Sequence, residues 1–246
     1  MNYNKENINI FKNPQILAHN LAQSFIDEID TNQSDKFSFA LAGGNTPQIF
    51  YKTLSLDQYS RNINWNRVLF FWGDERCVSP ESNDSNYKMV KESLLNNIEI
   101  PSDNIHRIKG EHEPHRETRR YSDLISKLLP SENDLPVFDF ILLGLGTDGH
   151  TASLFPDSNN LAIKNEVCSV ATHPESGQTR ITLNLPVIMN ARDVVFMVTG
   201  KKKSNIIKKI LINKKVTSHY PASLVLEKRE NVRWFLDNEA GSPLIK

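Results

Sequence analysis

Residues 138–144 read Phe138-Asp139-Phe140-Ile141-Leu142-Leu143-Gly144, a short and largely apolar run that stops at a glycine. An apolar run of this length is typical of a buried strand in a parallel sheet. Three further runs have the same form, and they span residues 37–41, 68–72 and 194–198. Helical patterns lie between them, at residues 14–30, from 47, 87–95, around 121–128 and 204–211. This alternation predicts an α/β fold with right-handed crossovers and a mostly parallel sheet.

The overall composition excludes several classes of protein. The 246 residues carry 29 Lys and Arg against 29 Asp and Glu, so the formal net charge is zero. A protein that binds nucleic acid through its phosphates normally has a basic excess, so no nucleic-acid partner is expected. With 39% hydrophobic and 24% charged residues, the chain is not a disordered one. No repeat, low-complexity tract or linker divides it, and we expect residues 1–246 to form a single domain.

Targeting and redox signals are weak. The polar N-terminus lacks the apolar core of a signal peptide, and no stretch approaches the roughly 18 apolar residues of a membrane span. Cys77 and Cys168 fit neither a disulfide framework nor a metal site. His112 and His115 flank Pro114, which breaks the helical geometry that would aim both rings at one ion. We therefore expect a cytoplasmic protein without metal, cofactor or membrane partner.

Ligands of open α/β sheets bind beyond the carboxyl ends of the strands, so the loops after the four predicted strands are the candidate site. The first of these loops contains Gly43, Gly44, Asn45 and Thr46. Glycines let backbone N–H groups converge, and the following helix favours an anion at its N-terminus, which suits a phosphate. The alternative is a tight turn, with Thr46 as helix cap and Pro47 at the first helical position. The loop lacks the Lys-Ser/Thr ending of a nucleotide P-loop.

The loop at 144–149 matches the dinucleotide pattern G-x-G-x-x-G, but its context argues against a nicotinamide cofactor. Pro156 follows the third glycine too soon for a long helix, and only Glu166 approximates the acidic residue that the pattern requires. Asp148 and His150 flank Gly149 in a bend, and an Asp–His pair suits general acid–base chemistry because histidine titrates near neutrality. The alternative is a capping Asp beside a surface His.

Two charged loops complete the candidate site. In Gly73-Asp74-Glu75-Arg76 the guanidinium of Arg76 suits a phosphate or carboxylate, although a structural ion-pair cluster is the alternative. Gly200-Lys201-Lys202-Lys203 opens the last long helix, where cations oppose the helix dipole. An anionic ligand would account for at least one lysine, and a solvated charge run is the alternative. The polar run 79–86 is predicted to be a solvent-facing loop.

Together these segments resemble the 6-phosphogluconolactonase family. The resemblance rests on Ala42-Gly-Gly-Asn-Thr-Pro47, Trp72-Gly-Asp-Glu-Arg76 and above all Leu143-Gly-Leu-Gly-Thr-Asp-Gly-His-Thr-Ala-Ser-Leu-Phe-Pro156. Residues 180–183, 200–203 and 234–237 also fit, so the match runs in order through nearly the whole chain. It implies a Rossmann-like three-layer α/β sandwich similar to that of glucosamine-6-phosphate deaminase.

The resemblance also implies an activity, the hydrolysis of 6-phospho-D-glucono-1,5-lactone in the oxidative pentose phosphate pathway. By this resemblance His150 is the general base, Asp148 its neighbouring carboxylate, and Asp74 and Arg76 lie in the substrate cleft. The residues implied to bind the phosphate are Gly43, Gly44, Asn45, Thr46, Arg180 and Lys203. Lys203 is preferred over Lys201 and Lys202 because the family spacing is Gly-x-x-Lys. Ala42 and Asn45 stand where the family usually has serines. Residues 43–46, called the phosphate cradle below, are therefore expected to bind the phosphate through their backbone.

Two other functions stay open at this stage. Glucosamine-6-phosphate deaminases resemble Gly-His-Ile-Ala-Phe-Asn-Glu-Pro at the third loop, and their carboxylate would fall at Phe155, which has none. A sugar-phosphate-binding regulator without catalysis would not need Asp148 and His150. The expected partner is a small sugar phosphate lactone, and the expected state is a monomer or weak homo-oligomer.

Overall fold

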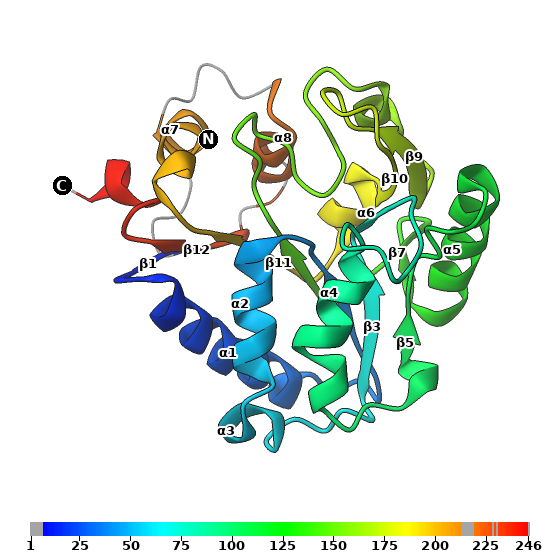
Figure 1. Ribbon diagram of the computed structural model, residues 1–246, viewed down its shortest axis with the longest axis horizontal. Helices are drawn as coiled ribbons and strands as arrows, with labels where there is room; N and C mark the ends of the chain where they lie inside the picture. The colour runs from blue at the N-terminus through cyan, green and yellow to red at the C-terminus, as the bar shows by residue number, and fades with distance from the viewer. Residues whose placement is uncertain (1–6, 213–218, 228, 230, 246) are drawn as a thin grey trace.

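The computed structural model describes residues 7–212, 219–227, 229 and 231–245. Its central feature is a seven-stranded sheet in which every neighbouring pair is parallel. In spatial order the strands are β1 (Ile8–Phe11), β12 (Arg233–Asp237), β11 (Asp193–Val198), β8 (Phe140–Leu143), β2 (Phe37–Leu41), β3 (Val68–Trp72) and β5 (Ile105–His106). The four strands predicted from sequence are β11, β8, β2 and β3, which lie side by side at the centre (Figure 1).

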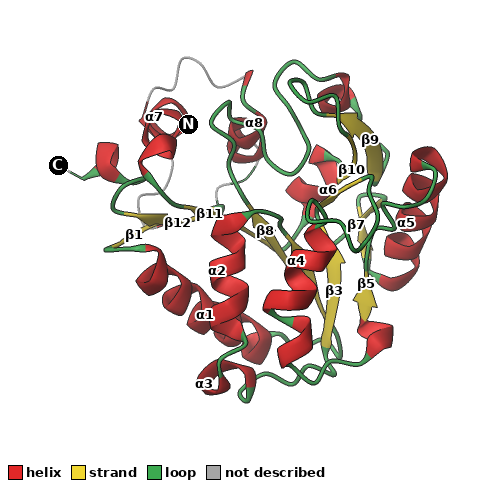
Figure 2. Cartoon of the chain, viewed as in Figure 1, coloured by secondary structure: helices red, strands yellow, loops and turns green. Residues whose placement is uncertain are grey.

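Helices cover both faces of this sheet, which confirms the expected three-layer α/β sandwich (Figure 2). On one face lie α1 (Pro14–Thr31), α2 (Asn45–Leu54) and α4 (Asn86–Ser93), with the short α3 (Asp57–Ser60) contacting α1 and α2. The remaining helices are α5 (Pro114–Leu128), α6 (Leu185–Asn190), α7 (Ser204–Ile207) and α8 (Pro221–Glu227). Because the chain steps from β2 to β3 in one direction and from β8 to β11 in the other, right-handed crossovers place their helices on opposite faces.

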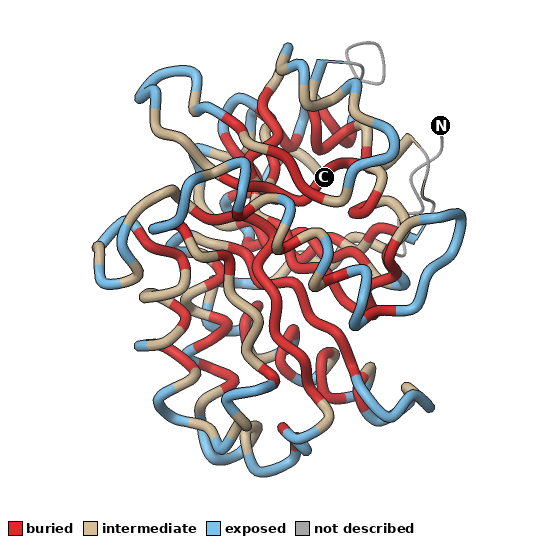
Figure 3. Tube along the Cα trace, turned by 90° about the vertical axis from the view of Figure 1, so that its right-hand side faces the viewer, coloured by how far each residue is buried: buried red, intermediate tan, exposed pale blue. Residues whose placement is uncertain are grey.

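The central strands are buried on both sides, as Figure 3 shows. Every residue of β2, β3 and β8 is buried. Phe25 of α1 packs between Phe39 of β2 and Phe140 of β8, at ring-centroid distances of 4.8 and 5.3 Å. Such aromatic pairs contribute about 0.5–1.5 kcal/mol beyond the area they bury. This packing fixes α1 against the strands that carry the first and third candidate loops.

A second, antiparallel sheet lies beyond the carboxyl end of β3. It consists of β4 (Asp74–Arg76), β10 (Thr179–Leu183) and β9 (Cys168–Thr172). Gly73 joins the two sheets, since its N–H donates to Leu41 in β2 and its carbonyl accepts from Leu183 in β10, both at 2.8 Å. A two-stranded ribbon, β6 (Ser131–Glu132) and β7 (Leu135–Pro136), completes the strands. The small antiparallel sheet was not predicted.

Several local predictions differ from the structure. Helix α2 begins at Asn45 with Gly44 as its N-cap, so Thr46 is not the cap and Pro47 lies third in the helix. The segment after Gly200 is one turn of 3₁₀ helix, Lys201–Lys203, followed by the short α7 and a π-helical turn, Lys208–Ile212, in place of a long α-helix. The polar run 79–86 is not solvent-facing throughout, because Ser85 and Asn86 at its end are buried.

Candidate active site

The carboxyl ends of β2, β3, β8 and β11 surround one cleft of about 420 Å³. It lies where the strand order reverses, between β2 and β8, which is the usual ligand site of open α/β sheets. The structure brings together nine of the ten predicted site residues as cleft lining, namely Gly43, Gly44, Asn45, Thr46, Asp74, Arg76, His150, Arg180 and Lys203. The tenth, Asp148, does not line the cleft but contacts His150.

The predicted cradle is held from below by Tyr51. Its buried hydroxyl accepts from the backbone N–H of Ala42 at 2.9 Å and donates to the carbonyl of the same residue at 2.8 Å. Gly44 adopts φ +98°, a left-handed conformation that suits glycine, and directs the chain into α2. The Thr46 hydroxyl hydrogen bonds to that of Thr199 at 2.8 Å, which ties the cradle to the loop after β11. The residues at the start of α2 therefore line the cleft, and the contacts of Tyr51 and Thr199 hold them in place.

Asp148 and His150 form the pair that their spacing predicts. The distance from His150 Nδ1 to Asp148 Oδ1 is 2.7 Å. The turn is possible because Gly149 has φ +89°, and because Gly146 has no side chain: a Cβ there would lie 2.2 Å from His150 Nδ1 and 2.3 Å from Asp148 Oδ1. After Gly149 the chain makes turns and a bridge between Thr151 and Leu154, and no long helix follows.

The protonation state of this pair fixes the tautomer of His150. Partial burial would by itself raise the pKa of Asp148, but the hydrogen bond and charge of His150 lower it to about 2. At neutral pH this carboxylate is therefore ionised and accepts hydrogen bonds only. The 2.7 Å contact then requires the hydrogen on His150 Nδ1, so in the neutral ring the free lone pair is on Nε2.

Asp74 and Glu75 have different environments although they are adjacent. Asp74 lines the cleft, and its Oδ2 accepts from Ser153 Oγ at 2.6 Å. Glu75 turns away and accepts from the N–H groups of Asn86 and Tyr87, at 2.8 and 2.7 Å, at the start of α4. Burial raises the pKa of Glu75, against the effect of these backbone hydrogen bonds. Glu75 is thus a structural residue, but it is held by backbone N–H groups and Ser85, and no ion pair of it is found among the described residues. Asp74 is the carboxylate that lines the cleft.

Two arginines come together although they are far apart in sequence. Antiparallel pairing of β4 with β10 places Arg180 opposite Arg76. Burial lowers the pKa of Arg180, opposed by the charge of Asp74. The Nε atoms of both arginines are buried and have no hydrogen-bond partner among the residues described. Both arginines line the cleft, and two guanidinium groups beside one cleft suit an anionic ligand.

Phe155 lies close to both His150 and Arg180. It is 2% exposed, and its ring lies 5.0 Å from that of His150 and 5.8 Å from the Arg180 guanidinium carbon. An apolar ring therefore occupies position 155.

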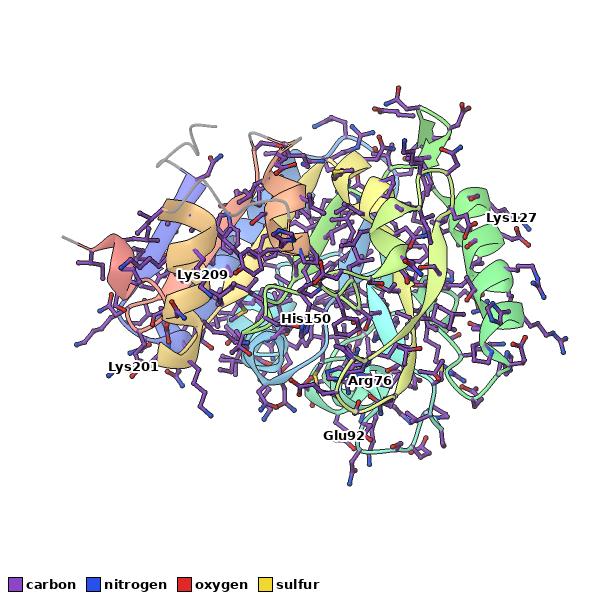
Figure 4. The ribbon with its side chains drawn as sticks, turned by 90° about the horizontal axis from the view of Figure 1, so that it is seen from above. Arg76, Glu92, Lys127, His150, Lys201 and Lys209 are labelled. Carbon is purple, nitrogen blue, oxygen red and sulfur yellow. The ribbon has the colours of Figure 1, made fainter. Side chains whose placement is uncertain are left out.

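Lys203 is the lysine of the 201–203 run that lines the cleft. Its neighbours Lys201 and Lys202 are exposed, and Figure 4 shows Lys201 at the edge of the molecule while His150 lies near the centre. Burial lowers the pKa of Lys203, opposed by the charge of Asp148. The family spacing that favoured Lys203 therefore agrees with its placement.

Sequence reasoning missed several residues of the site. Asn86 and Thr199 line the cleft. Ser153 was not predicted either, and its Oγ donates to Asp74 Oδ2. Tyr121 braces the end of β3 as Tyr51 braces the end of β2, since its hydroxyl bonds to both the N–H and the carbonyl of Trp72, at 2.8 and 3.1 Å. Both tyrosines lie on helices, where the pattern identifies them only as core residues.

Comparison with known proteins identifies the family of this chain. The sequence model of a protein family described as "Glucosamine-6-phosphate isomerases/6-phosphogluconolactonase" matches residues 12–234. The chain belongs to this family. It is similar to a 6-phosphogluconolactonase of Haemophilus influenzae, with 40% identity over 94% of this chain and 96% of the relative.

Solved structures support the family's fold. The 6-phosphogluconolactonase from Trypanosoma brucei superposes with a TM-score of 0.88 at 32% identity, covering 97% of this chain and 98% of that one. A monomeric glucosamine-6-phosphate deaminase superposes with a TM-score of 0.81 over 96% of this chain and 98% of that one, but at 20% identity it shows only the shared fold. In the described part of this family member, no helix is long and apolar enough to cross a bilayer.

Proposed function

We propose that this protein hydrolyses 6-phospho-D-glucono-1,5-lactone to 6-phospho-D-gluconate in the oxidative pentose phosphate pathway. Relatives named 6-phosphogluconolactonase match almost the full chain. The observation that carries the proposal is the 2.7 Å contact between Asp148 Oδ1 and His150 Nδ1 at the edge of a cleft of about 420 Å³. A lactone carbonyl is already electrophilic, so an oriented water and a base are sufficient for its hydrolysis.

His150 is assigned as the general base. Neutral His150 takes a proton from water at Nε2, and the water oxygen bonds to C1 of the lactone. The tetrahedral intermediate then collapses, the bond between C1 and the ring oxygen breaks, and the imidazolium returns the proton to that oxygen. General acid–base catalysis of this kind is worth about 10² to 10⁴ in rate. Asp148 keeps the ring in the required tautomer and stabilises the imidazolium.

The remaining residues bind and orient the substrate. We assign the phosphate to the backbone of Gly43, Gly44, Asn45 and Thr46, with Arg180 and Lys203 as its cations. Arg76, which lines the cleft, is assigned to the oxyanion on C1. Asp74, whose Oδ2 accepts from Ser153 Oγ, is assigned to accept from substrate hydroxyls. Phosphate binding would fix C1 against His150, which supplies the positioning part of catalysis.

Broader properties are proposed on separate grounds. We take residues 1–246 as one domain, because β1 near one end of the chain pairs in parallel with β12 near the other. A cytoplasmic location agrees with two free thiols, Cys77 and Cys168. A monomer or weak homo-oligomer is the state we propose.

The direct test is to add the purified protein to freshly prepared lactone and follow its loss above the spontaneous rate. We expect enzyme-dependent hydrolysis without added metal. A parallel assay follows ammonia release from glucosamine 6-phosphate, for which we expect no activity because Phe155 carries no carboxylate. Ammonia release without lactone hydrolysis would identify a deaminase. Tight lactone binding without either reaction would identify a regulator.

A further inference from the structure

The side chain of Asn86 lies between the phosphate cradle and Asp74. Asn86 is the first residue of α4 and only 2% exposed, yet it lines the cleft. Its Nδ2 donates to the carbonyl oxygen of Asp74 at 3.0 Å and to Asp74 Oδ1 at 3.3 Å. On its other side, a Cβ added to Gly43 would lie 2.0 Å from Asn86 Oδ1. The amide therefore fills the space that the missing side chain of Gly43 leaves.

The backbone of Asn86 is fixed independently of this contact. Its N–H donates to Glu75 Oε1 at 2.8 Å, and the neighbouring Ser85 is the helix cap, with its Oγ accepting from Lys88. Ser85 Oγ also donates to Glu75 Oε2 at 3.1 Å. Glu75 thus anchors the start of α4 directly beside β4, and these hydrogen bonds fix the backbone from which the Asn86 side chain extends.

Asp74 receives one donor on each carboxylate oxygen. Ser153 Oγ donates to Oδ2 at 2.6 Å, and Asn86 Nδ2 donates to Oδ1. A side-chain amide supplies a donor without adding a charge beside the carboxylate, whereas a lysine or arginine would neutralise it. Both side chains of this contact are almost fully buried, so the loss of one donor leaves a buried lone pair unsatisfied.

We propose that Asn86 is a positioning residue that fixes the Asp74 carboxylate at a set distance from the phosphate cradle. The inference rests on the proposed lactonase function, because it concerns the placement of the sugar relative to its phosphate. Asn86 contacts Gly43, which is assigned to the phosphate, and Asp74, which is assigned to the sugar hydroxyls. Its amide thereby sets the spacing between the two ends of the bound substrate.

Three variants at Asn86 and its neighbour test this role. Asn86→Ala removes the donor and the bulk, Asn86→Asp keeps the bulk but replaces the donor with a second carboxylate facing Asp74, and Ser85→Ala is the matched control at the same helix end. We expect both Asn86 variants to lower kcat at least about tenfold, equivalent to about 1.4 kcal/mol. Inhibition by inorganic phosphate, which probes the cradle alone, should change less than kcat in Asn86→Ala, because this variant adds no charge beside the cradle. Ser85→Ala should lower the unfolding temperature while kcat stays near wild type.

Double-mutant cycles separate positioning from general destabilisation. In an Asp74→Ala background, Asn86→Ala should cause little further loss of kcat, because the carboxylate that it positions is absent. Gly43→Ala should be far less damaging in an Asn86→Ala background than alone, because the 2.0 Å clash is relieved. Wild-type kcat in Asn86→Asp, or additive losses in the Asp74 cycle, would overturn the role while leaving the lactonase function intact. A wild-type protein without lactonase activity would overturn both.

Discussion

The contact between Gly146 and the Asp148–His150 pair gives a sharp prediction for Gly146→Ala. The new Cβ would lie 2.2 Å from His150 Nδ1 and 2.3 Å from Asp148 Oδ1, whereas ordinary contacts begin at 3.4 Å. The backbone of Gly146 is not in the left-handed region, so alanine is compatible with its conformation. The variant therefore acts through this steric contact, and the pair must give way.

The size of the effect follows from the displacement. Restoring ordinary contact moves the His150 ring by about 1 Å, and a misplacement of that size costs about 10²-fold in rate. We expect kcat to fall by about that factor, equivalent to about 2.7 kcal/mol, with little change in KM because the cradle is a separate loop. Overpacking should also reduce the stability by about 1–3 kcal/mol.

Lactone hydrolysis kinetics and thermal unfolding of Gly146→Ala measure both effects. Gly144→Ala is the matched control, because it lies in the same loop and nothing comes within 4 Å of its added Cβ. It should unfold close to the wild-type temperature and lose much less kcat. A Gly146→Ala enzyme whose kcat stays within about threefold of wild type would refute the assigned role of the pair.

Three further predictions concern charged residues. Arg180→Ala should raise KM about 10- to 100-fold, from the loss of a charge-assisted hydrogen bond of about 1.5–3 kcal/mol, and an unchanged KM would contradict its phosphate role. Lys203→Ala should weaken competitive inhibition by inorganic phosphate whereas Lys201→Ala should not, and equal effects would point to a diffuse charge run. Asp148→Asn should reduce stability by at most about 1 kcal/mol, since the Asp148 side chain is 44% exposed. Because the folded pKa of Asp148 is lowered to about 2, that difference should be present at pH 7 and vanish as the pH falls from about 4 to below 2, which denaturant unfolding at both pH values measures.

The parts of the fold that sequence predicted are those with local signals. Strands β2, β3 and β8 are buried on both sides, so each reads as an apolar run that ends at a glycine or just before one. The edge strands β1 and β5 are only partly buried, and their pattern carries no such signal. The π-helical turn after α7 has the apolar spacing of a helix, so its different hydrogen bonding could not be read from the residues.

In the candidate site, too, contacts between residues close in sequence were predictable, whereas contacts between distant residues were not. Asp148 and His150 are two positions apart, so their contact follows from one bent loop. The placement of Arg180 beside Arg76 depends on antiparallel pairing of β10 with β4, and only the family resemblance indicated it. The bond from Ser153 to Asp74 joins positions 79 residues apart, and no local pattern predicts such a contact. The burial of Asn86 in the cleft was not predicted, because a polar run such as 79–86 normally faces solvent.

The most direct test of the central claim is the turnover of 6-phospho-D-glucono-1,5-lactone by His150→Ala. The measurement compares its kcat with wild type and with the spontaneous rate, alongside the inhibition constant of inorganic phosphate. We predict a loss of about 10² to 10⁴ in kcat with phosphate inhibition retained, because His150 moves the proton and the cradle holds the phosphate. Near-normal turnover by His150→Ala would contradict the account.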